Sequence, residues 1–256
     1  MKKIVSSFIA LSFLFCSCDN ISNEKEQTND DQEVVAETGS LEEIIERHIE
    51  SNLEISGTED YSFKIYKEHL DGDDKMDAII TVNRLQFALD EAAKSENSAK
   101  RAEFGFMGNY NYLFYYDGGL DKISPQIAIP STPQAELKVS FEHVSSGAYK
   151  DILIDFRVRN ASYKDFYTVS NHTPRRIFQW KNFDGLGSKT SEAFTFKIQE
   201  GAVGLQNDIV VMKATIDQPK EKVDLYTFEP KLIESNELVH RFFYSDQMGK
   251  YVTKKK

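Results

Sequence analysis

The chain has 256 residues and a formal net charge of −10, with 41 acidic and 31 basic side chains. A protein this acidic repels the phosphate backbone, so we expect no nucleic-acid partner. Both of its cysteines, Cys16 and Cys18, lie near the amino terminus. The remainder of the chain therefore cannot form a disulfide or a cysteine metal site.

The amino terminus has the pattern of an export signal. Lys2 and Lys3 precede an apolar run over residues 4–15, and the small residue Ser17 stands directly before Cys18. The apolar run is shorter than the ~20 residues that a membrane-spanning helix needs. An ordinary secretory signal and a single membrane anchor are the alternatives.

A small residue followed by a cysteine resembles the signal of bacterial lipoproteins. That signal has Leu and then a small residue at the positions that Phe15 and Cys16 occupy here. The resemblance implies that residues 1–17 are a signal peptide and that Cys18 is lipidated. It also implies a protein of the cell envelope, anchored to the outer membrane by its lipid and facing the periplasm or the cell surface.

Residues 18–39 are polar and acidic, with little apolar content. Such a segment cannot bury enough surface to offset the entropy of ordering it, so we expect a flexible acidic tether. The remaining residues, 40–256, are enough for one substantial domain.

The periodicity of residues 40–256 predicts a single, mainly β domain. Ser40 and Glu43 form a capping box, which predicts a short N-terminal helix. Alternating and β-branched residues predict strands over residues 61–67, 78–82 and 110–116. Residues 90–101 are rich in Ala, Glu and Lys and predict one helical insertion.

The strand pattern recurs, which predicts about three degenerate antiparallel β-meander units. Their approximate bounds are 58–135, 136–190 and 191–256. Repeats that cannot bury their own faces stack on one another. We therefore expect a sheet stack or an incomplete, propeller-like arrangement; chance similarity of apolar runs is the alternative.

The three copies align without gaps on three aspartates that each precede an apolar run, namely Asp77, Asp151 and Asp208. In each copy an aromatic strand and then a further short strand follow. For the third copy this predicts an aromatic strand over residues 225–228 and a last strand over residues 241–244.

Residues 69–77 resemble the calcium loops of FG-GAP and integrin-type repeats, which lie between two strands. The ligands that the resemblance implies for Ca²⁺ are the carboxylates of Asp71, Asp73 and Asp77 and the main-chain carbonyl of Lys75. The residues that depart from the pattern are His69 and Asp74. An acidic β-turn that binds no ion is the alternative.

Aromatic side chains crowd the strand predicted over residues 110–116. Because successive side chains of a strand point to opposite faces, one face is core and the other is free to stack on a sugar or a peptide. The candidate ligand surface consists of Tyr110, Tyr112, Tyr115 and Tyr116. Packing beneath the helical insertion is the alternative.

These patterns predict a lipid-anchored envelope protein whose folded part is a non-catalytic binding or structural module for a protein or glycan. The sequence contains no serine nucleophile elbow, zinc-protease helix or phosphate loop. One alternative is an envelope hydrolase that uses carboxylates such as Glu68, Asp71 and Asp73 as acid and base. Another is an assembly subunit that exposes its sheet edges to a partner.

Overall fold

The computed structural model describes residues 39–97, 108–202 and 204–253. Its described part is mainly β, as the sequence predicts, with thirteen strands in two antiparallel sheets and two helices. The leader, Cys18 and nearly all of the predicted tether lie outside the described residues. Among the described helices, none has the length and apolar character needed to cross a membrane.

The first sheet follows helix α1 (Leu41–Asn52) and contains five strands, in the order β1-β2-β3-β4 with β5 also paired to β3. Helix α2 (Leu85–Lys94) lies between β2 and β3 in the chain. The strands are β1 (Ser62–Glu68), β2 (Asp77–Asn83), β3 (Asn111–Asp117), β4 (Lys122–Ile123) and β5 (Ile127–Ala128).

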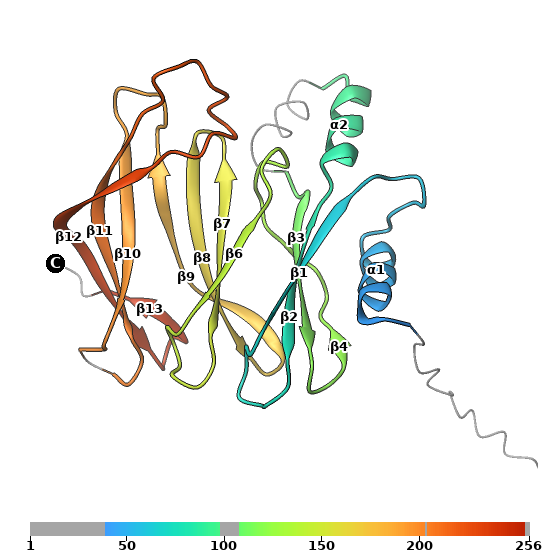
Figure 1. The fold of residues 1–256 in the computed structure, drawn as a ribbon, viewed down its shortest axis with the longest axis horizontal. Coiled ribbons are helices and arrows are strands. Elements are labelled where there is room, and N and C mark those ends of the chain that lie inside the picture. Colours follow the sequence, from blue (N-terminus) through green and yellow to red (C-terminus); the bar gives the residue numbers. More distant parts are fainter. Residues whose placement is uncertain (1–38, 98–107, 203, 254–256) are drawn as a thin grey trace, which may run out of the picture. The chain divides into compact units, whose positions relative to one another are not determined.

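The second sheet contains eight strands that pair in chain order from β6 to β13. They are β6 (Lys138–Glu142), β7 (Asp151–Val158), β8 (Ala161–Ser170), β9 (Thr173–Asp184), β10 (Glu192–Gln199), β11 (Asp208–Ile216), β12 (Leu232–Ser245) and β13 (Lys250–Val252). The β9–β10 register contains two residue pairs, at Phe183 and Asp184. This short joint lets the sheet fold into two halves whose facing side chains share one core cluster (Figure 1).

The strands thus form three successive four-stranded meanders: β1–β4 (the first meander), β6–β9 (the second) and β10–β13 (the third). The aspartates on which the sequence copies align each begin the second strand of a meander, and each is at most 2% exposed. Asp77 accepts a hydrogen bond from the Leu70 amide, Asp151 from the Val144 amide and Asp208 from the Ala202 amide. Each carboxylate therefore fastens the preceding loop to the start of its strand.

The meanders stack in one direction. The third residue after each aspartate lies in a different core cluster: Ile80 packs with α1, Ile154 with the first meander and Val211 with the second. Residues at the intervening position point to the opposite face, as the alternation of a strand requires. Each meander thus turns the same face, called here its front face, toward the preceding layer.

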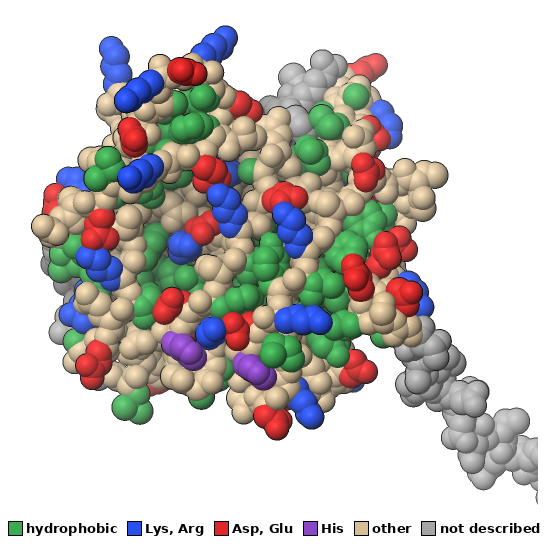
Figure 2. Space-filling view, viewed as in Figure 1, with side chains coloured by type: hydrophobic (Ala, Val, Ile, Leu, Met, Phe, Trp, Pro, Cys, Tyr) green, Lys and Arg blue, Asp and Glu red, His purple; other side chains and the backbone are tan. Residues whose placement is uncertain are grey.

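The two ends of the stack are covered in different ways. Helix α1 lies over the front face of the first meander, where Ile45 and Ile49 are buried against Phe114 (Figure 1). The rear face of the third meander is instead polar, with the ion pairs Lys197–Glu234 and Arg241–Asp208. Over the face drawn in Figure 2, basic and acidic side chains are interspersed.

Two elements differ from the sequence prediction. The helical insertion begins earlier than predicted, at Leu85, and ends at Lys94; residues 98–101 lie outside the described part. Residues 225–228 form a turn in a loop, and not the predicted strand. Residues 241–244, predicted as a last short strand, belong to the end of β12, the third strand of the third meander. The sequence does not show where β12 begins, because its first part is a polar stretch without alternation.

Substitution of Asp151 by Ala tests the role of the strand-initial carboxylates. Its carboxylate accepts bonds from the Val144 amide and from both the amide and the hydroxyl of Ser145. Because one buried and two partly buried donors lose their acceptor, we expect a loss of about 3 kcal/mol in the free energy of unfolding. Urea denaturation measures it, with the exposed Asp74→Ala as control. A loss below about 0.5 kcal/mol for Asp151→Ala contradicts the assignment.

Candidate metal centre

Two carboxylates meet where the first meander turns. Asp71 lies in the loop between β1 and β2, and Asp117 is the last residue of β3, with only 3% of its side chain exposed. Asp117 accepts a hydrogen bond from the amide of Leu120 at 2.8 Å through Oδ1. Its second oxygen, Oδ2, faces the neighbouring meander.

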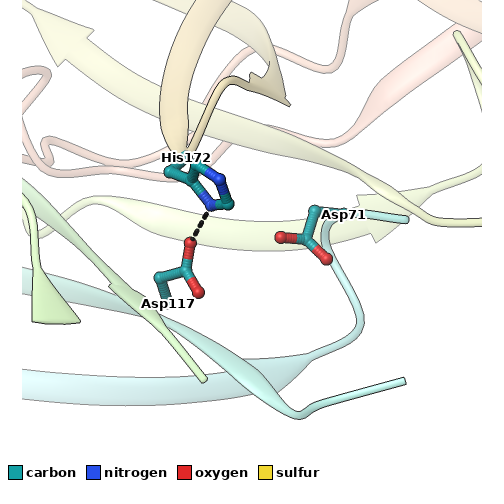
Figure 3. Close-up of side chains that lie close together, drawn as sticks. All are labelled: Asp71, Asp117 and His172. Atoms are coloured by element: carbon teal, nitrogen blue, oxygen red, sulfur yellow. Dashed lines mark hydrogen bonds and ion pairs between the residues drawn. The ribbon is translucent and has the colours of Figure 1, made fainter. Parts of the chain in front are cut away.

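The second meander supplies the third side chain. The hairpin between β8 and β9 has a two-residue loop, Asn171-His172, with φ values of 51° and 60°. Two positive φ values are typical of a type I′ turn, whose twist matches that of the paired strands. This turn places Nδ1 of His172 2.7 Å from Oδ2 of Asp117 (Figure 3). Ligand atoms of Asp71, Asp117 and His172 lie within 4.8 Å of one another.

A buried phenol donates a hydrogen bond to one of the two carboxylates. Tyr115, which is 0% exposed, donates a hydrogen bond to Oδ2 of Asp71 at 3.4 Å. Burial, together with the negative charges of Asp77, Asp117 and Asp71, raises the pKa of Tyr115. The phenol therefore stays protonated at neutral pH and remains a donor to the site.

Comparison of the first two meanders shows that the two carboxylates occur only in the first. Asp71 and Ser145 each lie six residues before the aligned aspartates Asp77 and Asp151. By strand register, Asp117 corresponds to Thr168. Ser145 and Thr168 form a hydroxyl–hydroxyl hydrogen bond at 3.2 Å. The first meander thus has two carboxylates where the second has two neutral partners, and a bound cation would compensate the repulsion between such like charges.

The acid-rich loop itself uses its oxygens locally. Oδ1 of Asp71 accepts the Asp73 amide at 2.9 Å, and Oδ1 of Asp73 accepts the Lys75 amide at 2.7 Å. The Lys75 carbonyl lies 2.8 Å from Nδ1 of His69, and Asp77 binds the amides of Leu70 and Gly118. In the described residues, the close metal-ligating group contains Asp71 but neither Asp73 nor Asp77. Calcium binding by the predicted ligands stays a prediction.

The four tyrosines of the predicted ligand surface are separated. Tyr115 is fully buried between the first and second meanders, so it belongs to no surface. Tyr112 and Tyr116 point to the opposite face, where they are half-buried with the residues beneath α1. Tyr110 lies beside Phe87 of α2, with 6.3 Å between the ring centroids. The sequence predicted that side chains of this strand alternate between two faces. The face that was expected to bind a ligand is instead covered by α1.

Sequence reasoning missed Asp117 and His172 as partners of Asp71, because both lie far along the chain from the acid-rich loop. The available signal was the alignment of the copies, which places Asp117 opposite Thr168 once the β2–β3 register is known. His172 belongs to another meander, and only the stacking of the layers brings it to the carboxylates.

Replacement of Gly118 by Ala tests the close approach of the β3–β4 turn to the acid-rich loop. A Cβ atom on Gly118 would lie 2.2 Å from the Met76 carbonyl oxygen, which belongs to the backbone. We expect a loss of about 1–3 kcal/mol in the free energy of unfolding. The matched control is Gly72→Ala in the facing loop, where a Cβ meets nothing within 4 Å. Equal stability of the two variants in urea contradicts this geometry.

Comparisons with known proteins give no relatives from which a role can be transferred: no family model, no curated protein and no solved structure matches the chain.

Proposed function

We propose that the chain is a lipid-anchored protein of the bacterial cell envelope whose folded part is a non-catalytic binding module dependent on a divalent cation. The observation that carries the cation proposal is the convergence of Asp71, Asp117 and His172 from two meanders. The sequence around Cys18 supports the proposal of a lipid anchor. We place the protein at the outer membrane, facing the periplasm or the cell surface.

The donor set favours a transition-metal ion over calcium. Ca²⁺ takes six to eight oxygen ligands, whereas an imidazole nitrogen with two carboxylates suits Zn²⁺ or Mn²⁺. Asp71 is shared with the loop implied by the calcium resemblance, but His172 adds nitrogen and comes from outside that loop. We therefore place the cation between the meanders and make Zn²⁺ and Mn²⁺ the first candidates.

The position of the site explains how an ion serves binding. The side chain of His172 is 57% exposed, so the site opens to solvent. Three protein ligands leave at least one coordination position of Zn²⁺ free. An oxygen of a protein or glycan partner then completes the coordination, and the ion bridges the partner to the stack.

The hydrolase alternative receives less support from the geometry. Oε2 of Glu68 lies 2.8 Å from Nζ of Lys150, and this hydrogen bond lowers the pKa of Glu68. A general acid needs a raised pKa, so the pairing favours a structural role that connects the first two meanders.

Metal titration distinguishes the two ion sites. Calorimetry of the purified full chain with Zn²⁺, Mn²⁺ and Ca²⁺ should show one site that prefers Zn²⁺ or Mn²⁺. His172→Gln and Asp117→Asn should weaken that binding by at least about 10-fold, since even disturbing an outer partner of a metal ligand costs this much. Asp73→Asn, which alters only the acid-rich loop, should leave it unchanged. Calcium binding that depends on Asp73 but not on His172 would instead support the loop.

Lipid attachment is tested separately in a bacterial host. Cys18→Ala should abolish incorporation of radiolabelled palmitate and release the protein from the membrane fraction, because no other cysteine follows residue 18. Cys16→Ala, two residues away, should keep both properties. A Cys18→Ala protein that stays labelled and membrane-bound overturns the anchor.

A further inference from the structure

A second site lies between the first and second meanders, away from the metal ligands. It is a cavity of about 270 Å³. Its walls include Ile129 and Pro130 from the segment after β5, and Phe156 and Tyr163, whose rings stack at 5.7 Å. An apolar cavity of ~150 Å³ is enough for a benzene ring, so this one is large enough for a ring with a polar substituent.

One end of the cavity is polar in a way that the repeat does not predict. Asp165 lies opposite Ile154 on the front face of the second meander, and the register equivalent in the first meander is Phe114, opposite Ile80. In the second meander, Arg176 pairs with Tyr167. The residue of the first meander equivalent to Arg176 is Ile123, which pairs with Tyr116.

The second meander therefore has an ion pair where the first has two apolar side chains packed beneath α1. Burial of the Asp165 carboxylate costs desolvation free energy that an apolar side chain at this position would not cost. A buried carboxylate beside a cavity is therefore a sign of binding, because departures from local folding rules concentrate at functional sites.

The hydrogen bonds of this pair decide which ligand fits. Asp165 has 2% of its side chain exposed and accepts three bonds, from Gln179 at 2.7 Å, Tyr167 at 3.1 Å and Arg176 at 3.2 Å. Its oxygens are thus occupied, and burial raises its pKa. The Arg176 side chain is 52% exposed and uses Nη1 for Asp165. The cavity offers donors, so its ligand must bring acceptors.

We propose that this cavity binds a small organic acid, with its apolar or aromatic body between Pro130 and Tyr163 and its carboxylate on Arg176. Asp165 is a positioning residue: it holds one edge of the guanidinium and leaves the other nitrogens to the ligand. A planar guanidinium matches a carboxylate with two parallel hydrogen bonds, which gives the site its preference for an acid.

Calorimetric titration of the purified full chain tests this with phenylacetate, hexanoate and the isosteric neutral phenylacetamide. Phenylacetate should bind saturably and at least about 10-fold more tightly than phenylacetamide, since hydrogen bonds to charged groups are the stronger ones. Arg176→Gln should abolish the preference for the acid. The neighbouring Arg175→Gln, which alternates to the other face of β9, should retain it.

A double variant with the residues of the first meander, Asp165→Phe with Arg176→Ile, separates binding from folding. It should still melt cooperatively, although Tyr167 and Gln179 lose their acceptor, and it should bind neither acid. The proposal is overturned if neither acid binds saturably, if acid and amide bind equally, or if Arg176→Gln or a folded double variant keeps the native affinity for phenylacetate.

Discussion

A four-stranded meander cannot cover an apolar face of its own, and the layered structure follows from this constraint. The cores lie between layers: one between α1 and the first meander, one between the first and second meanders, and one between the second and third. Each layer depends on its neighbours for burial, so stability is shared along the stack in the manner of repeat proteins.

Both proposed binding sites lie where the copies differ. At the turn beside the strand-initial aspartate, the second meander has the hydroxyl pair Ser145–Thr168, whereas the first has two carboxylates that meet His172. On the front face, the apolar Phe114 of the first meander becomes Asp165 in the second. The fold provides equivalent positions in each meander, and different residues at those positions place polar or charged groups where the other copy has packing side chains.

The sequence predicted the fold class and the capping box of α1, because both depend on local patterns that folding did not override. It also singled out Asp77, Asp151 and Asp208, which begin equivalent strands. It predicted only the end of β12, at residues 241–244, because residues 233–240 show no alternation that a single sequence could reveal. The candidate site could be predicted only as far as Asp71. Asp117 and His172 reach it through strand register and through the stacking of two meanders, and neither leaves a local signature.

The direction of the stack has a consequence for self-association. All three meanders turn the same face toward the preceding layer, so they stack head to tail. A head-to-tail stack that does not close into a ring can in principle be extended by further layers. The amphipathic helix at the front and the charged sheet face at the back make the two extremities non-complementary. The helix therefore ends the stack as well as packing on it: without it, the apolar front face of the first meander would be exposed to solvent.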